Sequence, residues 1–134
     1  SECMEGTDIF IGVSAPNVLI EQDIKSMAAK SIVFALSNPD PEIDPLVARK
    51  YAEVVATGRS DQPNQINNVL AFPGVFRGLL DAGIKQITDE MLLNAAIALA
   101  STVSESELST NYIIPSVFDN RVCKVVADEI SKKT

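Results

Sequence analysis

Histidine is absent from this chain of 134 residues. Histidine is the side chain most often used as a general base and as a metal ligand, because its unperturbed pKa lies close to neutrality. If the chain takes part in catalysis, proton transfer must fall to other residue types or to another stretch of polypeptide.

Cysteine is scarce, with only Cys3 and Cys123 and no Cys-x-x-Cys pair. Two cysteines so far apart do not make a disulfide framework. We interpret both as reduced thiols, the state typical of cytoplasmic proteins. The chain begins at Ser1 with polar and acidic residues and without the basic region of a signal peptide, which also favours a cytoplasmic location.

Long apolar runs are missing too, because no stretch approaches the roughly 18 residues that a membrane-spanning helix needs. The net charge of -7 and the pI of about 4.5 disfavour nucleic acid and anionic membranes as partners. A small anionic substrate stays open, since local positive groups override net charge. The composition, 46% hydrophobic and 22% charged, is that of an ordinary globular domain.

Three short apolar segments predict β-strands, at residues 8–12, 31–36 and 53–57. Each is continuous rather than alternating, which is typical of parallel strands buried on both faces. Helix-length segments at 21–29 and 45–52 lie between them, and Asp44-Pro45 supplies an N-cap followed by proline at the first helical position. The order β-α-β-α-β predicts a parallel, Rossmann-like α/β sheet with right-handed crossovers.

Helices are expected after the sheet. Residues 68–80 contain Pro73 and Gly74, so we expect a kinked or restarted helix. Residues 88–103 predict an amphipathic helix, and 116–130 predict a last helix opened by a capping box of Ser116 with Asp119. The expected buried side chains of these two helices are Leu92, Ala95, Ala96, Leu99 and Val103 in the first, and Val122, Cys123, Val126 and Ile130 in the second.

We expect residues 1–85 to be the C-terminal half of a cofactor-binding domain and residues 86–134 to be a helical segment packed on it. Three parallel strands with uncovered edges make a marginal sheet. The sequence therefore favours part of a larger α/β domain, with earlier strands upstream.

Ligands bind beyond the carboxyl ends of the strands in an open parallel sheet. Here these ends are residues 13–16, 37–40 and 57–61, all small and polar, and the amide pair Asn67-Asn68 follows the third closely. Side-chain amides donate and accept hydrogen bonds without carrying charge, which suits them to orienting a small polar ligand. Plainer readings stand beside this one, since Asn67 is also suited to capping a helix and Arg59 to pairing with Asp61.

Five ordered motifs identify a resemblance. They are residues 12–16 (GVSAP), 34–42 (FALSNPDPE), 56–61 (ATGRSD), 63–68 (PNQINN) and 72–74 (FPG), followed by 112–116 (YIIPS) with Phe118 and Asp119. Together they resemble the C-terminal part of the cofactor-binding domain of a bacterial-type malic enzyme. The resemblance covers nearly the whole chain, and the ordered set is far more specific than any single motif.

The resemblance implies oxidation of L-malate with NAD or NADP, followed by decarboxylation to pyruvate and carbon dioxide with the help of Mg or Mn. By the family's pattern, Asn38, Asn67 and Asn68 would bind the substrate, and Val13, Ser14 and Asn38 would lie against the cofactor. A homo-oligomer is expected. No Gly-x-Gly-x-x-Gly loop occurs before a strand–helix junction. The resemblance implies that the family's base, acid, metal ligands and phosphate loop lie upstream, in the rest of the enzyme, and that the isolated chain would show no turnover.

Two other functions stay open. One is another NAD(P)-dependent hydroxy-acid dehydrogenase, which would lack an acidic metal site upstream. The other is a non-catalytic interaction module with the same half-domain shape, which would lack the reactive groups altogether.

Overall fold

The computed structural model describes residues 2–132, and these residues form two compact units. The first unit comprises the residues up to Ile66 together with Ser109–Asn111. The second comprises Asn67–Leu108 and the residues from Tyr112 onward. Contacts within the chain thus divide it between Ile66 and Asn67 rather than near residue 85. The domain boundary of the complete protein stays a prediction.

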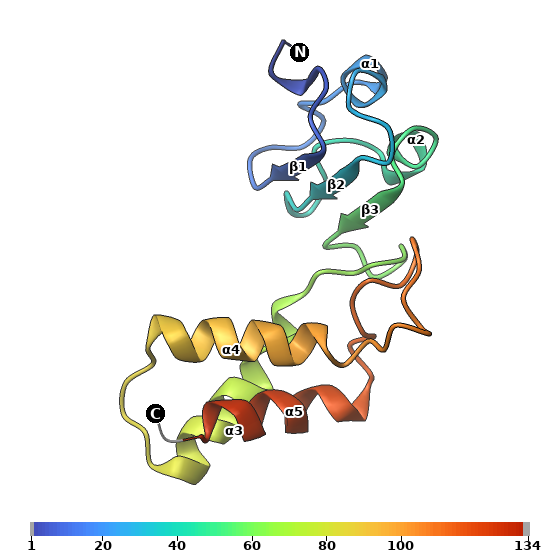
Figure 1. Ribbon diagram of the computed structural model, residues 1–134. Coiled ribbons are helices and arrows are strands. Elements are labelled where there is room, and N and C mark those ends of the chain that lie inside the picture. Colours follow the sequence, from blue (N-terminus) through green and yellow to red (C-terminus); the bar gives the residue numbers. More distant parts are fainter. Residues whose placement is uncertain (1, 133–134) are drawn as a thin grey trace. The chain divides into compact units, whose positions relative to one another are not determined.

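The first unit is a three-stranded parallel sheet in the order β1-β2-β3. A 3-10 helix, η1 (Glu2–Met4), precedes β1 (Ile9–Gly12), α1 (Glu21–Lys25), β2 (Ile32–Ala35), α2 (Pro45–Ala48) and β3 (Val54–Thr57). The three predicted strands and the parallel α/β class are confirmed. Figure 1 shows α1 and α2 on one face of the sheet, as successive right-handed crossovers in one direction require.

One face of this sheet holds the core of the unit. Val33 and Val55 pack in one buried cluster with Ile24 of α1. On the opposite face of β1, Ile9 and Ile11 are 55% and 63% exposed. The prediction of burial on both faces is therefore wrong for β1 within this chain, because both helices of the unit cover the same side.

The two helices of this unit are short, and capping residues mark the start of α2 and the end of α1. At α2, the side chain of Asp44 accepts a hydrogen bond of 2.8 Å from the N–H of Leu46, and Pro45 takes the first helical position, as predicted. Helix α1 ends at Lys25, several residues before the predicted end. The next residue, Ser26, adopts the C-cap, and its hydroxyl donates back to the carbonyl oxygen of Asp23 at 2.8 Å.

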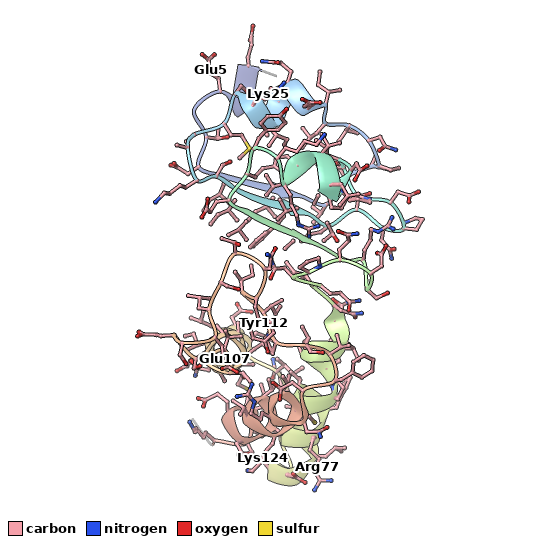
Figure 2. All side chains as sticks on the ribbon, turned by 90° about the vertical axis from the view of Figure 1, so that its right-hand side faces the viewer. Glu5, Lys25, Arg77, Glu107, Tyr112 and Lys124 are labelled. Atoms are coloured by element: carbon pink, nitrogen blue, oxygen red, sulfur yellow. The ribbon has the colours of Figure 1, made fainter. Side chains whose placement is uncertain are left out.

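The second unit is a cluster of helices: η2 (Asn68–Leu70), α3 (Phe72–Ala82), α4 (Asp89–Ala100) and α5 (Asn120–Ile130). The restarted helix is confirmed, since a 3-10 turn gives way to α3 with Pro73 in its first turn. Helix α5 packs against both α3 and α4. The outer sides of the helices carry charge, as Arg77 and Lys124 show by pointing away from the helix cluster (Figure 2).

Two glycines of α3 let α5 approach closely. A Cβ atom on Gly74 would lie 2.6 Å from Cβ of Val126, and one on Gly78 would lie 2.6 Å from the carbonyl oxygen of Ala127. Both distances are shorter than side-chain contacts allow. The two positions therefore require glycine for contact rather than for backbone conformation.

In the second unit, the predicted buried face of α4, the predicted start of α5 and the predicted burial of Cys123 are wrong. The buried side of α4 is formed by Met91 and Ala95, whereas Leu92 and Ala96 are exposed. This helix is apolar on nearly every side, so periodicity alone does not select the buried face. Helix α5 begins after Asp119, whose carboxylate accepts from the N–H of Arg121 at 2.9 Å.

Ser116 therefore does not open α5; its hydroxyl accepts a hydrogen bond from the N–H of Phe118 within the preceding turn. Cys123 is exposed, not part of the core, because its side chain borders an open hollow beside Pro73 and Phe118. Both cysteines are free thiols, as expected. Within residues 2–132, no helix has the length and apolar character that crossing a membrane requires.

Candidate functional site at the carboxyl edge of the sheet

The carboxyl ends of the three strands lie in register. Gly12 is paired with Ala35, and Ala35 with Thr57, so the loops that follow these residues leave the same edge of the sheet. Val13 and Ser14 follow β1, and Asn38 lies three residues after β2. All three are exposed at this edge. The structure thus brings Val13, Ser14 and Asn38 together as the topology predicts, while their roles stay predictions.

A buried carboxylate joins two of these loops. One oxygen of Glu42, Oε1, accepts a hydrogen bond of 2.8 Å from the N–H of Ser14 and one of 3.3 Å from its hydroxyl. The other oxygen, Oε2, accepts a hydrogen bond of 3.0 Å from the N–H of Ser37. Glu42 is completely buried. A single side chain thus holds the loop after β1 to the loop after β2.

Gly12 makes room for this carboxylate. A Cβ atom at residue 12 would lie 2.6 Å from both Cδ and Oε1 of Glu42, and 2.7 Å from the ring of Phe10. The carboxylate of Glu42 and the ring of Phe10 therefore explain why residue 12 is glycine, since the backbone of β1 must approach both closely.

The hydrogen bonds determine the charge state of Glu42. Burial alone would raise the pKa of Glu42, because a charged group loses its hydration in the interior. The N–H groups of Ser14 and Ser37 outweigh that effect and hold the pKa below its ordinary value of 4.5. Glu42 is therefore ionised at neutral pH and serves as an acceptor.

The backbone strengthens the same junction. The N–H of Asn17 donates to the carbonyl oxygen of Pro41 at 3.1 Å, and the N–H of Leu19 donates to that of Glu42 at 3.0 Å. The two loops are therefore tied along their length. Asn38 follows Ser37 directly and is joined to Pro39 by a cis peptide bond.

The third loop carries an ion pair. Nη2 of Arg59 lies 2.7 Å from Oδ2 of Asp61, and Nε of Arg59 donates to Oδ1 at 2.9 Å. The hydrogen bond to Asp61 raises the pKa of Arg59 above its ordinary value. The pairing of Arg59 with Asp61 is therefore confirmed. A ligand at Arg59 would have to compete with this carboxylate.

Asn67 and Asn68 belong to the second unit. Oδ1 of Asn67 accepts a hydrogen bond of 3.1 Å from the N–H of Val69 and so caps η2. The capping role foreseen for Asn67 is confirmed. Its amide nitrogen has no hydrogen-bond partner among the described residues, so a donor stays free for a ligand. Asn68 is the first residue of η2 and is exposed.

Sequence reasoning missed Glu42 as a residue of this edge. The sequence around Glu42 gives little signal of this role, because two further acidic residues, Asp40 and Asp44, lie two positions to either side of it. The donors to Glu42 come from Ser14 and Ser37, and the close contact with Gly12 is visible only in the structure.

Metal ligands do not gather in the described part of the chain. Within residues 2–132, no group of three or more Cys, Asp or Glu side chains could hold a metal ion. These residues alone do not fit a Mg or Mn site. The expectation that such ligands lie in an upstream segment stays a prediction.

Comparisons with known proteins agree with the geometry. The family described as "Malic enzyme, NAD binding domain" matches residues 6–134. The chain is 56% identical over 130 residues to the NAD-dependent malic enzyme of Geobacillus stearothermophilus, covering 97% of this chain and 27% of that protein. It is 54% identical over 126 residues to the bifunctional malic/malolactic enzyme of Bacillus subtilis, covering 93% and 31%.

Solved structures show the same relationship. The crystal structure of the NAD-dependent malic enzyme of Thermotoga maritima matches with a TM-score of 0.90 and 46% identity, over 98% of this chain and 34% of that one. The chain thus spans about a third or less of the length of these relatives. The chain belongs to the malic enzyme family, and its residues 6–134 match the NAD-binding domain of that family.

Proposed function

We propose that this chain is part of a malic enzyme that oxidises L-malate with NAD or NADP and decarboxylates the product to pyruvate and carbon dioxide. The family match over residues 6–134 carries the proposal. The names of the relatives support it, since both NAD-dependent and NADP-dependent malic enzymes are among them. Dependence on Mg or Mn belongs to the same proposal, with ligands outside this chain.

Within that reaction, the residues of this chain would bind and orient the cofactor and malate. Val13 and Ser14, exposed at the carboxyl edge, would lie along the nicotinamide side of the cofactor. Asn38, from the adjacent loop, would donate its amide hydrogens to malate and also border the cofactor. Because an amide keeps its donors at every pH, it holds a carboxylate or hydroxyl without taking part in proton transfer.

Asn67 and Asn68 complete the proposed set. Asn67 would bind malate through its free amide nitrogen while its oxygen caps η2, and Asn68 would support it. None of these groups is a general base. We therefore propose that the chain by itself, without the rest of the enzyme, has no measurable turnover.

Location and assembly are part of the proposal. The free thiols Cys3 and Cys123 suit the reducing cytoplasm. Phe72, Phe76 and Leu80 form an exposed apolar row along α3, which supports burial of this helix in a homo-oligomer. Light scattering of the full-length protein tests this, since a monomer at micromolar concentration would contradict it.

The reaction is tested with the full-length protein, L-malate, Mn²⁺ and either cofactor, following reduced nicotinamide and pyruvate together. One pyruvate for each reduced cofactor is the expected result, and the preferred cofactor decides between NAD and NADP. Reduction without pyruvate would indicate a hydroxy-acid dehydrogenase instead. A folded protein that reduces neither cofactor would indicate a non-catalytic module.

A second candidate activity follows from one relative. The Bacillus subtilis protein, 54% identical over 126 residues, is named a bifunctional malic/malolactic enzyme. Lactate measured in the same assay tests that activity. Lactate formed from malate without net cofactor reduction would establish it, and pyruvate alone would rule it out.

A further inference from the structure

Glu42 is unusual because its carboxylate is completely buried and no cation pairs with it among residues 2–132. Its carboxylate accepts hydrogen bonds from neutral donors, among them the N–H groups of Ser14 and Ser37 and the hydroxyl of Ser14. Burying a charge is costly, and apolar side chains of similar volume often stabilise a fold at least as well. Stability alone is therefore a weak reason for a glutamate at this position.

The arrangement of the two oxygens suggests another reason. Oε1 is committed to the loop after β1, and Oε2 to the loop after β2. A carboxylate is rigid and planar, so these bonds fix the separation and orientation of the two loops. Ser14 on one loop and Asn38 on the other, adjacent to Ser37, are both exposed at the edge where a ligand would bind.

We propose that Glu42 is a positioning residue: it holds the Val13-Ser14 loop and the Ser37-Asn38 loop at the separation needed to bind cofactor and substrate together, without touching either. This inference rests on the proposed malic enzyme function. It adds a residue to the site that acts through Ser14 and Ser37. Gly12 belongs to the same arrangement, because any side chain there would displace the carboxylate.

Glu42→Gln in the full-length protein is the direct test. The amide keeps the size of the side chain but turns one acceptor oxygen into an NH₂ donor, which then faces the N–H of Ser14 or Ser37. One loop is released as a result. Glu53→Gln is the matched control, since Glu53 is exposed and precedes β3 at the opposite edge of the same sheet.

Displacing reacting groups by about an ångström lowers rates by up to about a hundredfold. We therefore expect kcat/KM for malate to fall by about 10- to 100-fold in Glu42→Gln and to stay at the wild-type value in Glu53→Gln. Cofactor affinity, measured by calorimetry without turnover, should weaken in parallel. Hydrogen exchange should rise in the peptides around residues 13–19 and 36–40 and nowhere else.

A purely structural role gives a different pattern. If Glu42 only stabilises the fold, the variant melts earlier, but its kcat/KM and cofactor affinity match the wild type at temperatures where it is folded. That result would overturn the proposal. Should Glu42→Gln fail to fold, Glu42→Asp decides the same question, because it keeps the charge but withdraws the carboxylate by one methylene group.

The experiment distinguishes failure of the proposed function from failure of the positioning role of Glu42. If the wild-type protein neither binds a nicotinamide cofactor nor turns over malate, the proposed function fails, and the positioning role fails with it. If the wild type is active and a folded Glu42 variant is equally active, only the positioning role fails. Loss of activity and affinity in a folded variant, with the Glu53 control intact, supports both.

Discussion

The side-chain nitrogen of Asn64 donates a hydrogen bond of 2.8 Å to the carbonyl oxygen of Thr110, a residue 46 positions further along the chain. The same nitrogen donates to the carbonyl oxygen of Val55 in β3 at 3.1 Å. Asn64 is buried and has a φ of +57°. It therefore ties Ser109–Asn111 to the sheet of the first unit.

Asn64→Ala should destabilise the full-length protein by about 2–3 kcal/mol, because the carbonyl oxygens of Val55 and Thr110 lose a donor and alanine is strained at positive φ. Asn64→Gly separates the two causes, since glycine accepts this φ without strain. Thermal denaturation should show a lower Tm for both variants, with alanine below glycine. A glycine variant as stable as the wild type would show that the amide contributes nothing.

Asn67→Ala should weaken transition-state stabilisation for malate by about 2–4 kcal/mol, as loss of one well-placed donor does elsewhere. It also removes the cap of η2, which is worth about 1 kcal/mol of stability. Asn67→Ser keeps the capping oxygen and removes the amide nitrogen. We expect kcat/KM to fall in both variants and Tm to fall only in the alanine variant. An unchanged kcat/KM in a folded Asn67→Ser protein would remove Asn67 from the site.

Acidic pH should reduce the contribution of Glu42 to the stability of the folded protein. Its pKa is lower in the folded protein than its ordinary value of 4.5, so the unfolded chain binds the proton more readily. The stabilisation is complete above pH 4.5 and is lost as the pH falls through the lower, folded value. The Tm difference between wild type and Glu42→Gln should therefore shrink below about pH 4.5. A Tm difference that stays constant from neutral pH to below about pH 4.5 would contradict the lowered pKa of Glu42.

Gly78→Ala should destabilise the pair of α3 and α5 by about 1–3 kcal/mol, since overpacking moves backbone and side chains from their places. The added methyl would meet the carbonyl oxygen of Ala127 at 2.6 Å. Arg77→Ala on the same helix is the control, because it breaks only an exposed ion pair with Asp81. Equal Tm values for the two variants would contradict this prediction, because they would show that α3 and α5 accommodate the added methyl group without loss of stability.

The sheet was predictable because its determinants are local. Three apolar runs, turn residues between them and the Asp44-Pro45 cap predicted the strands and the start of α2 correctly, whereas α2 ends at Ala48 and not at the predicted residue 52. The convergence of Val13, Ser14 and Asn38 at one edge followed from the parallel order alone. The ordered motifs added the family, which the comparisons then showed.

The helices were less predictable because their surroundings decide which side is buried. Helix α4 offers apolar side chains in most directions, and contact with α5 buries Met91 and Ala95 instead of Leu92. The capping box predicted for Ser116 with Asp119 placed the start of α5 too early, because Asp119 is itself the N-cap of this helix. Glu42 depends on donors 28 and 5 positions away, a combination that no local pattern encodes.

The close approach at Gly78 also has a genetic consequence. A side chain added at residue 78 would collide with Cβ of Ile130 at 2.7 Å as well as with the backbone of α5. Replacing Ile130 by alanine removes its Cγ2, at 2.8 Å, but keeps its Cβ, and no substitution removes the carbonyl oxygen of Ala127. Second-site mutations that restore the stability lost by a substitution at Gly78 should therefore be rare and partial. Reversion of residue 78 to glycine should be the main route by which stability is regained.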